Sequence, residues 1–323
     1  MRALRGLEGL SLQSQQSSAL SAHPAYASSS STWPRELCLE RAVPSFNDVE
    51  KLASRFGPPI ARQLYRDLRS GRREYRSFTE AQNAAAPGYS STDLTWTVAK
   101  KTEAFRSSTA VTDPVITSSE FALFATLFAL RDLTSLSVLD FGGAAGASYY
   151  RARPWVRARS VDWRVIETAA MVEAARTSAP AELSFHPDLF SATTDWTSPP
   201  DVVLVSSTLQ YLEDPETTLS DLVGTEPRVL VLARTPLASS SRSHTLVQKS
   251  RLSENGPGSL PPGVRDSTFA YPVTFLPLQT VTSILSARYR HVHHIVEESN
   301  LRTLRGGVVV GQHSFIASGQ GSR

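Results

Sequence analysis

The sequence predicts an α/β fold built on a doubly wound, mostly parallel sheet. From about residue 117 onward, short apolar runs alternate with helical stretches, which is typical of a parallel sheet with helices on both faces. The runs lack strict polar–apolar alternation, so we expect strands that are buried on both sides. One run, Ser137–Phe141, leads into a glycine-rich turn and a helix, the local pattern with which many ligand-binding α/β units begin.

Five apolar runs are predicted to form the parallel strands. They are Ser137–Phe141, Trp163–Ile166, Leu183–His186, Val202–Val205 and Val229–Leu232. After a helix over Leu278–Ala287, the segments Tyr289–Val296 and Gly307–Ser318 are expected to close the sheet as an antiparallel pair. The stretch from Pro236 to Pro262 is rich in Ser, Gly and Pro without periodicity, so we expect a long loop there.

The main domain boundary is expected just before Thr117. Thr117-Ser-Ser-Glu120 has the pattern of a capping box and leads directly into an apolar core helix. Residues 33–116 are interpreted as a helical N-terminal cap or lid region, and 117–318 as the cofactor-binding domain. We expect residues 1–32, rich in Ser and Ala, to be a disordered leader, with an organellar transit peptide as the alternative, and 319–323 to be a disordered tail.

Composition is that of an ordinary globular chain. The 33 Lys and Arg nearly balance the 30 Asp and Glu, which indicates no nucleic-acid partner. The single cysteine, Cys38, leaves no disulfide framework and no cysteine-based zinc cluster. The longest apolar run, Phe121–Leu130, is too short to cross a bilayer. We therefore expect a cytoplasmic protein without membrane contact, and its oligomeric state stays open.

Asp140 and the glycines behind it carry the main functional signal. Gly142, Gly143 and Gly146 fit D-x-G-x-x-x-G and not the G-x-G-x-x-G of dinucleotide sites. Glycines let the backbone pass close to a cofactor, beside the free amide groups of a helix N-terminus. A carboxylate at Asp140 would repel a pyrophosphate and attract the cationic amino-acid part of S-adenosylmethionine. The pattern favours this methyl donor as cofactor, with a purely structural tight turn as the alternative.

Acidic residues after the next two strands extend the predicted cofactor site. Glu167 ends the second strand, where a carboxylate accepts hydrogen bonds from ribose hydroxyls in doubly wound folds. The alternative is a simple cap of the helix that starts at Thr168. Asp188 follows the third strand, where it would reach adenine or else only stabilise a turn.

The turn after the fourth strand is expected to line the ligand crevice beyond the strand ends. Ser206 and Ser207 are candidates for the cofactor-facing wall. Gln210 and Tyr211 are candidates for the wall that faces the methyl acceptor, and packing is an equal alternative for Tyr211. Tyr89, in a turn-like Pro-Gly-Tyr segment, is predicted to fold back as part of a lid and contact the substrate or the methyl-donor end of the cofactor. The equal alternative is a surface turn whose tyrosine packs on the N-terminal region.

No catalytic base is predicted. His244, Tyr150 and Glu213 are the available groups if the acceptor is a hydroxyl, and a structural or surface role is the alternative for each. Tyr150 is also a candidate for contact with the acceptor. No metal site is predicted, because the three late histidines alternate with apolar residues as in a half-buried strand and have no acidic ligand at a suitable spacing. They are His291, His293 and His294.

In this order the segments resemble a family of class I S-adenosylmethionine-dependent methyltransferases, known chiefly from bacteria and often encoded beside polysaccharide-biosynthesis genes. The motifs that carry the resemblance are Phe78–Ala81, Pro87–Tyr89, Val138–Gly143, Val165–Glu167, Ser206–Leu212, Arg234–Pro236, Leu246–Gln248 and Tyr271–Pro272. The resemblance implies a Rossmann-like catalytic domain and places Arg234 beside the acceptor. Ala144 stands where such proteins have a further glycine, and Ala233 where they have an Asp, which removes a carboxylate from any acid–base role at that position.

These observations predict an S-adenosylmethionine-dependent methyltransferase that acts on a small-molecule or saccharide acceptor by O- or N-methylation. Transfer of a methyl group from a sulfonium requires alignment of donor and acceptor more than a strong acid, so the lack of an obvious catalytic triad is no objection. Two alternatives stay open: a domain that binds a ligand or protein without catalysis, and a nicotinamide-dependent oxidoreductase.

Overall fold

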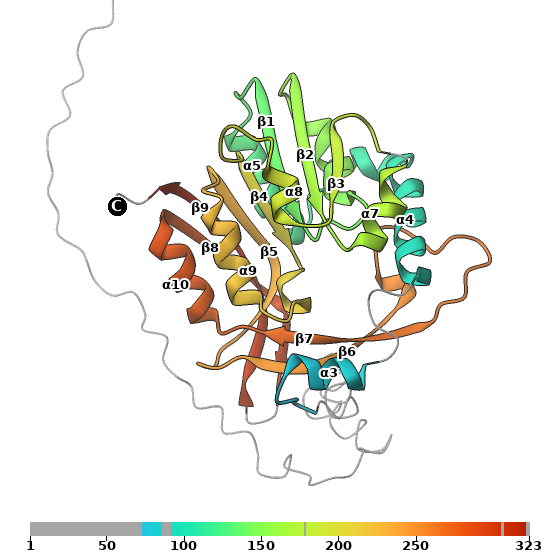
Figure 1. Cartoon of the computed structure of the whole chain (residues 1–323), viewed down its shortest axis with the longest axis vertical. Helices are drawn as coiled ribbons and strands as arrows, with labels where there is room; N and C mark the ends of the chain where they lie inside the picture. The colour runs from blue at the N-terminus through green and yellow to red at the C-terminus, as the bar shows by residue number, and fades with distance from the viewer. Residues whose placement is uncertain (1–72, 86–91, 178, 305–306, 321–323) are drawn as a thin grey trace, which may run out of the picture. The chain divides into compact units, whose positions relative to one another are not determined.

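The structure, a computed structural model, describes residues 73–85, 92–177, 179–304 and 307–320 (Figure 1). The predicted leader, the cap region up to residue 72, Cys38 and the turn that contains Tyr89 lie outside the described residues. The described part of the cap region is helical, with α3 at Phe78–Ala84, α4 at Thr92–Arg106 and a short 3₁₀ helix, η2, at Thr109–Thr112.

A seven-stranded sheet with the order β3-β2-β1-β4-β5-β9-β8 forms the centre of the domain. Its five parallel strands are β1 Ser135–Phe141, β2 Ser160–Ile166, β3 Leu183–His186, β4 Val202–Ser206 and β5 Val229–Ala238. β9, Val309–Gln320, runs antiparallel between β5 and β8, Tyr289–Thr303. The predicted doubly wound, mostly parallel sheet with a closing antiparallel pair is therefore confirmed. The strand order reverses between β1 and β4, which is where open α/β sheets bind their ligands.

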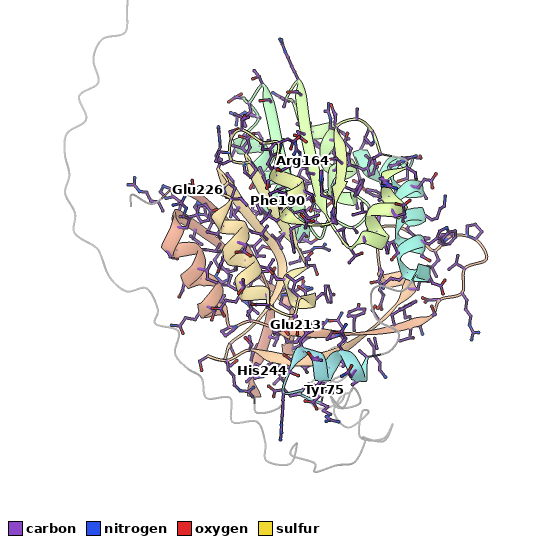
Figure 2. The ribbon with its side chains drawn as sticks, viewed as in Figure 1. Tyr75, Arg164, Phe190, Glu213, Glu226 and His244 are labelled. Atoms are coloured by element: carbon purple, nitrogen blue, oxygen red, sulfur yellow. The ribbon has the colours of Figure 1, made fainter. Side chains whose placement is uncertain are left out.

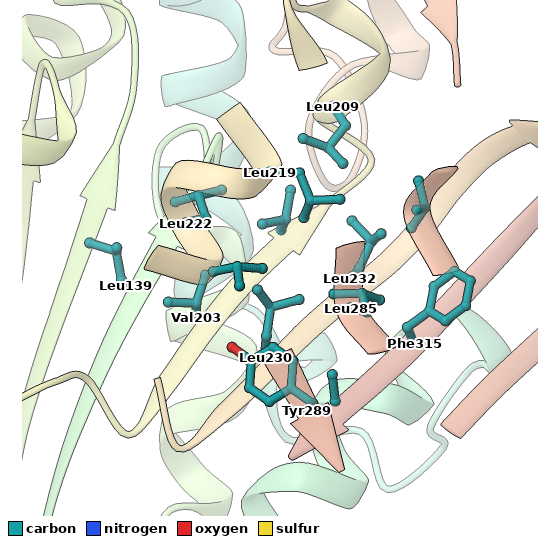
Figure 3. Close-up of a cluster of buried hydrophobic side chains, with 14 of the residues drawn as sticks. Leu139, Val203, Leu209, Leu219, Leu222, Leu230, Leu232, Leu285, Tyr289 and Phe315 are labelled. Atoms are coloured by element: carbon teal, nitrogen blue, oxygen red, sulfur yellow. The ribbon is translucent and has the colours of Figure 1, made fainter. Parts of the chain in front are cut away.

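Helices cover both faces of this sheet, which explains why its strands show no alternation. In β4, Val203 and Val205 face a core that contains residues of α8 Leu189–Thr193, α9 Pro215–Gly224 and α10 Leu278–Arg288. Figure 3 shows part of this core, including Leu222 of α9 and Leu285 of α10. The neighbouring residues of β4, Val202 and Leu204, face a second core.

The second core lies under α5, Ser118–Ala129, and α6, Ala147–Ala152. The capping box at the start of α5 is present: the backbone N–H of Thr117 donates to Glu120 Oε2 at 2.9 Å. The two faces of α5 differ in burial: Leu123 and Leu127 are buried against the sheet side, and Phe128 is exposed. Among the described residues, no helix is both long and apolar enough to span a membrane.

A second, two-stranded sheet pairs β6, His244–Arg251, with β7, Thr268–Phe275. The prediction of a loop from Pro236 to Pro262 is therefore wrong over β6, and β5 also continues to Ala238. The reason is that the buried positions of β6 include His244 and Ser250, so burial alternates along the strand where hydrophobicity does not. α3 packs against this hairpin, and β7 contacts the turn that follows β4 (Figure 1).

Candidate cofactor site at the carboxyl-terminal edge of the sheet

The turn between β1 and α6 has no room for side chains at its glycines. Gly142 has a φ of +71°, and a Cβ there would overlap the side chain of Thr208. A Cβ on Gly143 would lie 2.5 Å from the carboxyl group of Asp140, and one on Gly146 2.9 Å from Leu183. Real Cβ atoms do not approach other atoms so closely. The three glycines that the sequence singled out are therefore required by local packing, whatever they bind.

Asp140 is the most unusual polar residue of the site. Its side chain is fully buried, and its Oδ2 accepts a hydrogen bond of 3.2 Å from the indole N–H of Trp163. Its other oxygen, Oδ1, has no hydrogen-bond partner within the described structure. Burial raises the pKa of Asp140 to about 7; the Trp163 hydrogen bond opposes this shift, and the charge of Glu167 adds to it. A buried acceptor without a donor is rare and marks a place where a ligand is expected.

Glu167 joins the two loops at the ends of β1 and β2. Its Oε1 accepts from the backbone N–H of Ala144 at 3.2 Å, and its Oε2 from that of Thr168 at 2.8 Å. The residue is buried, and this burial raises the pKa of its carboxyl group. Thr168 is the N-cap residue of α7, Ala169–Arg176, so the capping role left open in the sequence is present. Each carboxylate oxygen keeps a second lone pair, so the predicted ribose contact stays a prediction.

Asp188 lies at the surface, at the carboxyl end of β3. Its Oδ1 accepts from the backbone N–H of Ser191 at 2.7 Å and caps α8. This backbone hydrogen bond lowers the pKa of Asp188. The residue thus has the turn role that the sequence left open, and its contact with adenine stays a prediction.

The loop after β4 holds one side chain in a fixed orientation. Gln210 lies in the 3₁₀ helix η4, Leu209–Tyr211, and its Nε2 donates to the carbonyl oxygen of Ser207 at 2.9 Å and to Ser207 Oγ at 3.0 Å. A carbonyl cannot donate, so the amide nitrogen must face Ser207 and the amide oxygen must face away. That oxygen, Gln210 Oε1, is buried and has no partner within the described residues. It is the second buried acceptor of the site without a donor.

Arg234 is the candidate site residue on β5. It sits where the pairing of β5 with β9 shifts register, between Leu232 and Thr235. Its backbone N–H donates to Ser314 Oγ, and its exposed side chain donates to Ser206 Oγ at 3.1 Å. This hydrogen bond links the end of β4 to the middle of β5 through two residues that were predicted to belong to the site. Ala233, where the resembling proteins have an Asp, is buried.

Tyr211 and Tyr150 have their rings packed against other aromatic residues. The ring of Tyr211 makes an edge contact with Tyr271 of β7, with centroids 5.2 Å apart. Tyr150 makes a similar contact with Tyr149 and lines a cavity of about 190 Å³ between α4, α6 and α7. The packing alternative is therefore present for Tyr211, and acceptor contact stays a prediction for both.

The other two groups considered as bases, His244 and Glu213, have polar partners of their own; both are labelled in Figure 2. His244 is buried; its Nδ1 lies 2.9 Å from Glu74 Oε1 and its Nε2 lies 2.7 Å from Ser240 Oγ. Glu213 accepts a hydrogen bond from Thr79 of α3. These contacts attach the segment around α3 to the rest of the domain. The late histidines are on β8, where His294 contacts His313 at 2.8 Å, and the described residues contain no cluster of three metal-binding side chains.

Backbone strain gathers at the same edge. Within the described residues, the positive-φ residues other than glycine are Ala144, Ser207, Arg234 and Glu226. Ala144 and Ser207 follow β1 and β4, and Arg234 lies within β5, directly after the last residue of β5 that pairs with β4. Strained backbone of this kind clusters at functional sites, where the surrounding structure holds it in place. Neither this strain nor the hydrogen bond from Trp163 to Asp140 was predicted from the sequence.

Comparisons with known proteins show only distant likeness. No protein-family model and no curated protein matches the chain significantly. Similar solved structures include CalS10, an amino pentose methyltransferase from Micromonospora echinaspora, with 15% identity, 61% of this chain and 92% of that chain covered, and a TM-score of 0.38. The CcbJ methyltransferase from Streptomyces caelestis has 12% identity, covers 70% and 99%, and has a TM-score of 0.38. The sugar N-methyltransferase KedS8 from Streptoalloteichus has 15% identity, covers 60% and 87%, and has a TM-score of 0.35. These values are too low to transfer a function to this chain.

Proposed function

We propose that this chain is an S-adenosylmethionine-dependent methyltransferase whose cofactor binds where β1 and β4 end. The observation that carries the proposal is the buried carboxyl group of Asp140, whose Oδ1 lacks a donor directly beside the glycine turn. S-adenosylmethionine brings an ammonium group, a sulfonium and two ribose hydroxyls to such an edge, all of which suit acceptor groups. A pyrophosphate at the glycine turn would bring negative charge beside Asp140, so the site suits a nicotinamide dinucleotide poorly.

We assign different residues of the site to different parts of the cofactor. Asp140 would hold the ammonium group, and Glu167 the ribose hydroxyls, while the backbone of the glycine turn lies against the rest of the cofactor. Asp188 is assigned to the adenine side, and Ser206 and Ser207 to the wall at the end of β4. When bound, the cofactor supplies an electrophilic methyl group on a sulfonium.

The remaining residues would position the methyl acceptor. Gln210 presents a fixed amide oxygen, which can accept a hydrogen bond from an N–H or O–H group but cannot take up a proton. Tyr211, on the same loop, and Arg234, on β5, are the other candidates for contact with the acceptor. We expect most of the rate acceleration to come from alignment of the acceptor with the methyl group of the cofactor. That the acceptor is a small molecule or a saccharide rests on the motif resemblance alone; O- and N-methylation are both compatible with Gln210.

Binding and turnover test this proposal separately. We expect S-adenosylhomocysteine to bind the full chain in calorimetry and to raise its melting temperature, because a ligand that binds only the folded state stabilises it. NAD is the matched control and should do neither. Methyl transfer is then measured from labelled S-adenosylmethionine to a panel of nucleotide-linked sugars and amino sugars. Binding of NAD in place of S-adenosylhomocysteine would exclude the proposal, and binding without transfer to any acceptor would support the non-catalytic alternative.

A further inference from the structure

The surroundings of Asp140 cannot stabilise a negative charge in the empty site. The side chain is fully buried, one oxygen has no partner, and the other has a single neutral donor, Trp163. A buried ionised carboxylate without a cation is costly, and such groups take up a proton instead. The free carboxyl group would then be neutral near neutral pH.

The charged and titratable neighbours reinforce this. On the β2 side, Glu167 adds a like charge, and Tyr149 of α6, which packs edge-on against Trp163, has its hydroxyl bonded to Glu182. On the β4 side the paired residue is Leu204, which is apolar. From β5, the charge of Arg234 acts the other way and lowers the pKa of Asp140; it is the weakest of these influences, and the exposed side chain of Arg234 is hydrogen-bonded to Ser206.

We propose that Asp140 carries a proton in the empty domain and releases it when the ammonium group of the cofactor binds. This inference rests on the proposed function of the site. The O–H bond of the carboxyl group breaks, the proton passes to solvent, and the carboxylate pairs with an ammonium that is already protonated, since α-amino groups have a pKa of about 8. Cofactor affinity is therefore linked to pH through one buried group.

The sign of the linkage follows from the pKa of Asp140, which burial raises from its ordinary value to about 7. Below that pH the proton must be removed before the ion pair can form, so affinity falls as pH falls. The dissociation constant should rise about fivefold from pH 7 to pH 6, where the amino group of the ligand stays protonated. For the empty domain, the native state binds the proton more tightly than the unfolded chain, so its stability decreases as the pH rises from about 4 to about 7.

Calorimetry of the full chain with S-adenosylhomocysteine tests the release directly. Titrations are run at several pH values in buffers with different ionisation enthalpies, so that the slope of heat against ionisation enthalpy counts protons. We expect nearly one proton released at about pH 6 and about half a proton at about pH 7, a range in which the amino group of the ligand is already protonated. The matched ligand control is 5′-methylthioadenosine, which lacks the amino-acid part and should bind without this release.

Asp140→Asn is the matched variant. It should bind S-adenosylhomocysteine more weakly and release no proton from this position, and its affinity should lose the fivefold change between pH 7 and pH 6. Without ligand, the melting temperature of the variant minus that of the wild type should increase as the pH rises from about 5 to about 8, because only the wild type must ionise a buried carboxyl group.

The outcomes separate the two proposals. If S-adenosylhomocysteine binds without releasing a proton, or if Asp140→Asn keeps the release, the inference is wrong while the proposed function stands. If the ligand does not bind, both fail. The melting-temperature comparison needs no ligand, and equal pH profiles for the variant and the wild type would overturn the inference by themselves.

Discussion

Asp140 and Asp162 lie on neighbouring strands of one sheet, β1 and β2, but toward opposite edges of it. Asp162, near the start of β2, accepts hydrogen bonds from Arg164 and from the indole N–H of Trp196. Although partial burial opposes the shift, these hydrogen bonds lower the pKa of Asp162. Asp140, near the end of β1, has one neutral donor and a pKa raised by burial. The carboxylate of Asp162, at the amino-terminal edge, thus has charged and neutral donors, whereas one oxygen of Asp140, at the carboxyl-terminal edge, has none.

Volume would direct attention to the opposite edge. A hollow of about 770 Å³ lies at the amino-terminal edge, lined by residues such as Ser135, Asp162 and Asp201. Its carboxylates Asp162 and Asp201 are paired; Asp201 accepts from both the backbone N–H and the hydroxyl of Ser137 at 3.0 Å. In the described structure three buried side-chain atoms have no hydrogen-bond partner: Asp140 Oδ1 and Gln210 Oε1 at the carboxyl-terminal edge, and the hydroxyl oxygen of Tyr289 at the start of β8. The proposed cofactor site therefore rests on its two unpaired acceptors and not on volume.

The largest expected effect comes from filling the glycine turn. Gly143→Val places side-chain atoms where the carboxyl group of Asp140 now lies, since even a Cβ would be 2.5 Å from it. We expect affinity for S-adenosylhomocysteine to fall more than a hundredfold, about 3 kcal/mol, in calorimetry. Gly224→Val is the control, because Gly224 has no positive φ and a Cβ there meets no atom within 4 Å. Equal losses in both variants would show that the turn is not the binding site.

Removal of the carboxylate at the end of β2 should have a smaller effect. Glu167→Ala loses charge-assisted hydrogen bonds and should weaken S-adenosylhomocysteine binding by about 1 to 3 kcal/mol. The matched variant at the opposite edge is Asp201→Asn, which should lower the melting temperature and leave affinity unchanged. If Glu167→Ala binds as tightly as the wild type, Glu167 only caps α7 and holds the turn.

The reverse pattern is expected at the amino-terminal edge. Arg164 is nearly buried, donates to Asp162, Asp195 and the carbonyl of Ala192, and lies over the ring of Trp196. Arg164→Ala should cost about 1 to 2 kcal/mol of stability, measured by denaturant unfolding, because two of its partners are partly solvated. Its affinity for S-adenosylhomocysteine should stay within twofold of the wild type. A large loss of affinity would mean that the two edges are not independent.

The parts of the fold that were predictable are those with local signals. Strands buried on both faces are continuous apolar runs, and the turn after Asp140 follows from adjacent residues. β6 was missed because His244 and Ser250 are polar residues buried by distant partners, Glu74 and Tyr271. The site shows the same difference between local sequence signals and contacts made by distant residues.

Within the site, Asp140 and Glu167 were found because each directly follows a run that could be recognised. The left-handed backbone at Ser207 and Arg234 could not be found, because it depends on pairing with Ala233 and Ser314 on other strands or at distant positions. Trp163 also gave no signal as a donor to Asp140, since in sequence it is only an aromatic residue of a strand. The two acidic residues could be predicted from their neighbours in sequence. The long-range contacts that bury them, and leave Asp140 Oδ1 without a donor, could not.

The smallest effect tests the strain at the carboxyl-terminal edge. Ala144 has a φ of +50°, a conformation that costs an L-residue about 1 to 2 kcal/mol and glycine almost nothing. Ala144→Gly recovers this cost but loses about 0.4 to 1 kcal/mol, because glycine makes the unfolded chain more flexible. The net gain should be about 0.5 kcal/mol, a rise in melting temperature of about 1 to 2 °C. Affinity for S-adenosylhomocysteine should be unchanged, since the backbone N–H that Glu167 binds is retained. Ala145→Gly is the control: Ala145 is buried and has no positive φ, so it should lose stability. A lower melting temperature for Ala144→Gly would mean that packing of the Ala144 methyl group outweighs the strain, and the contrast between the edges would then rest on the unpaired acceptors alone.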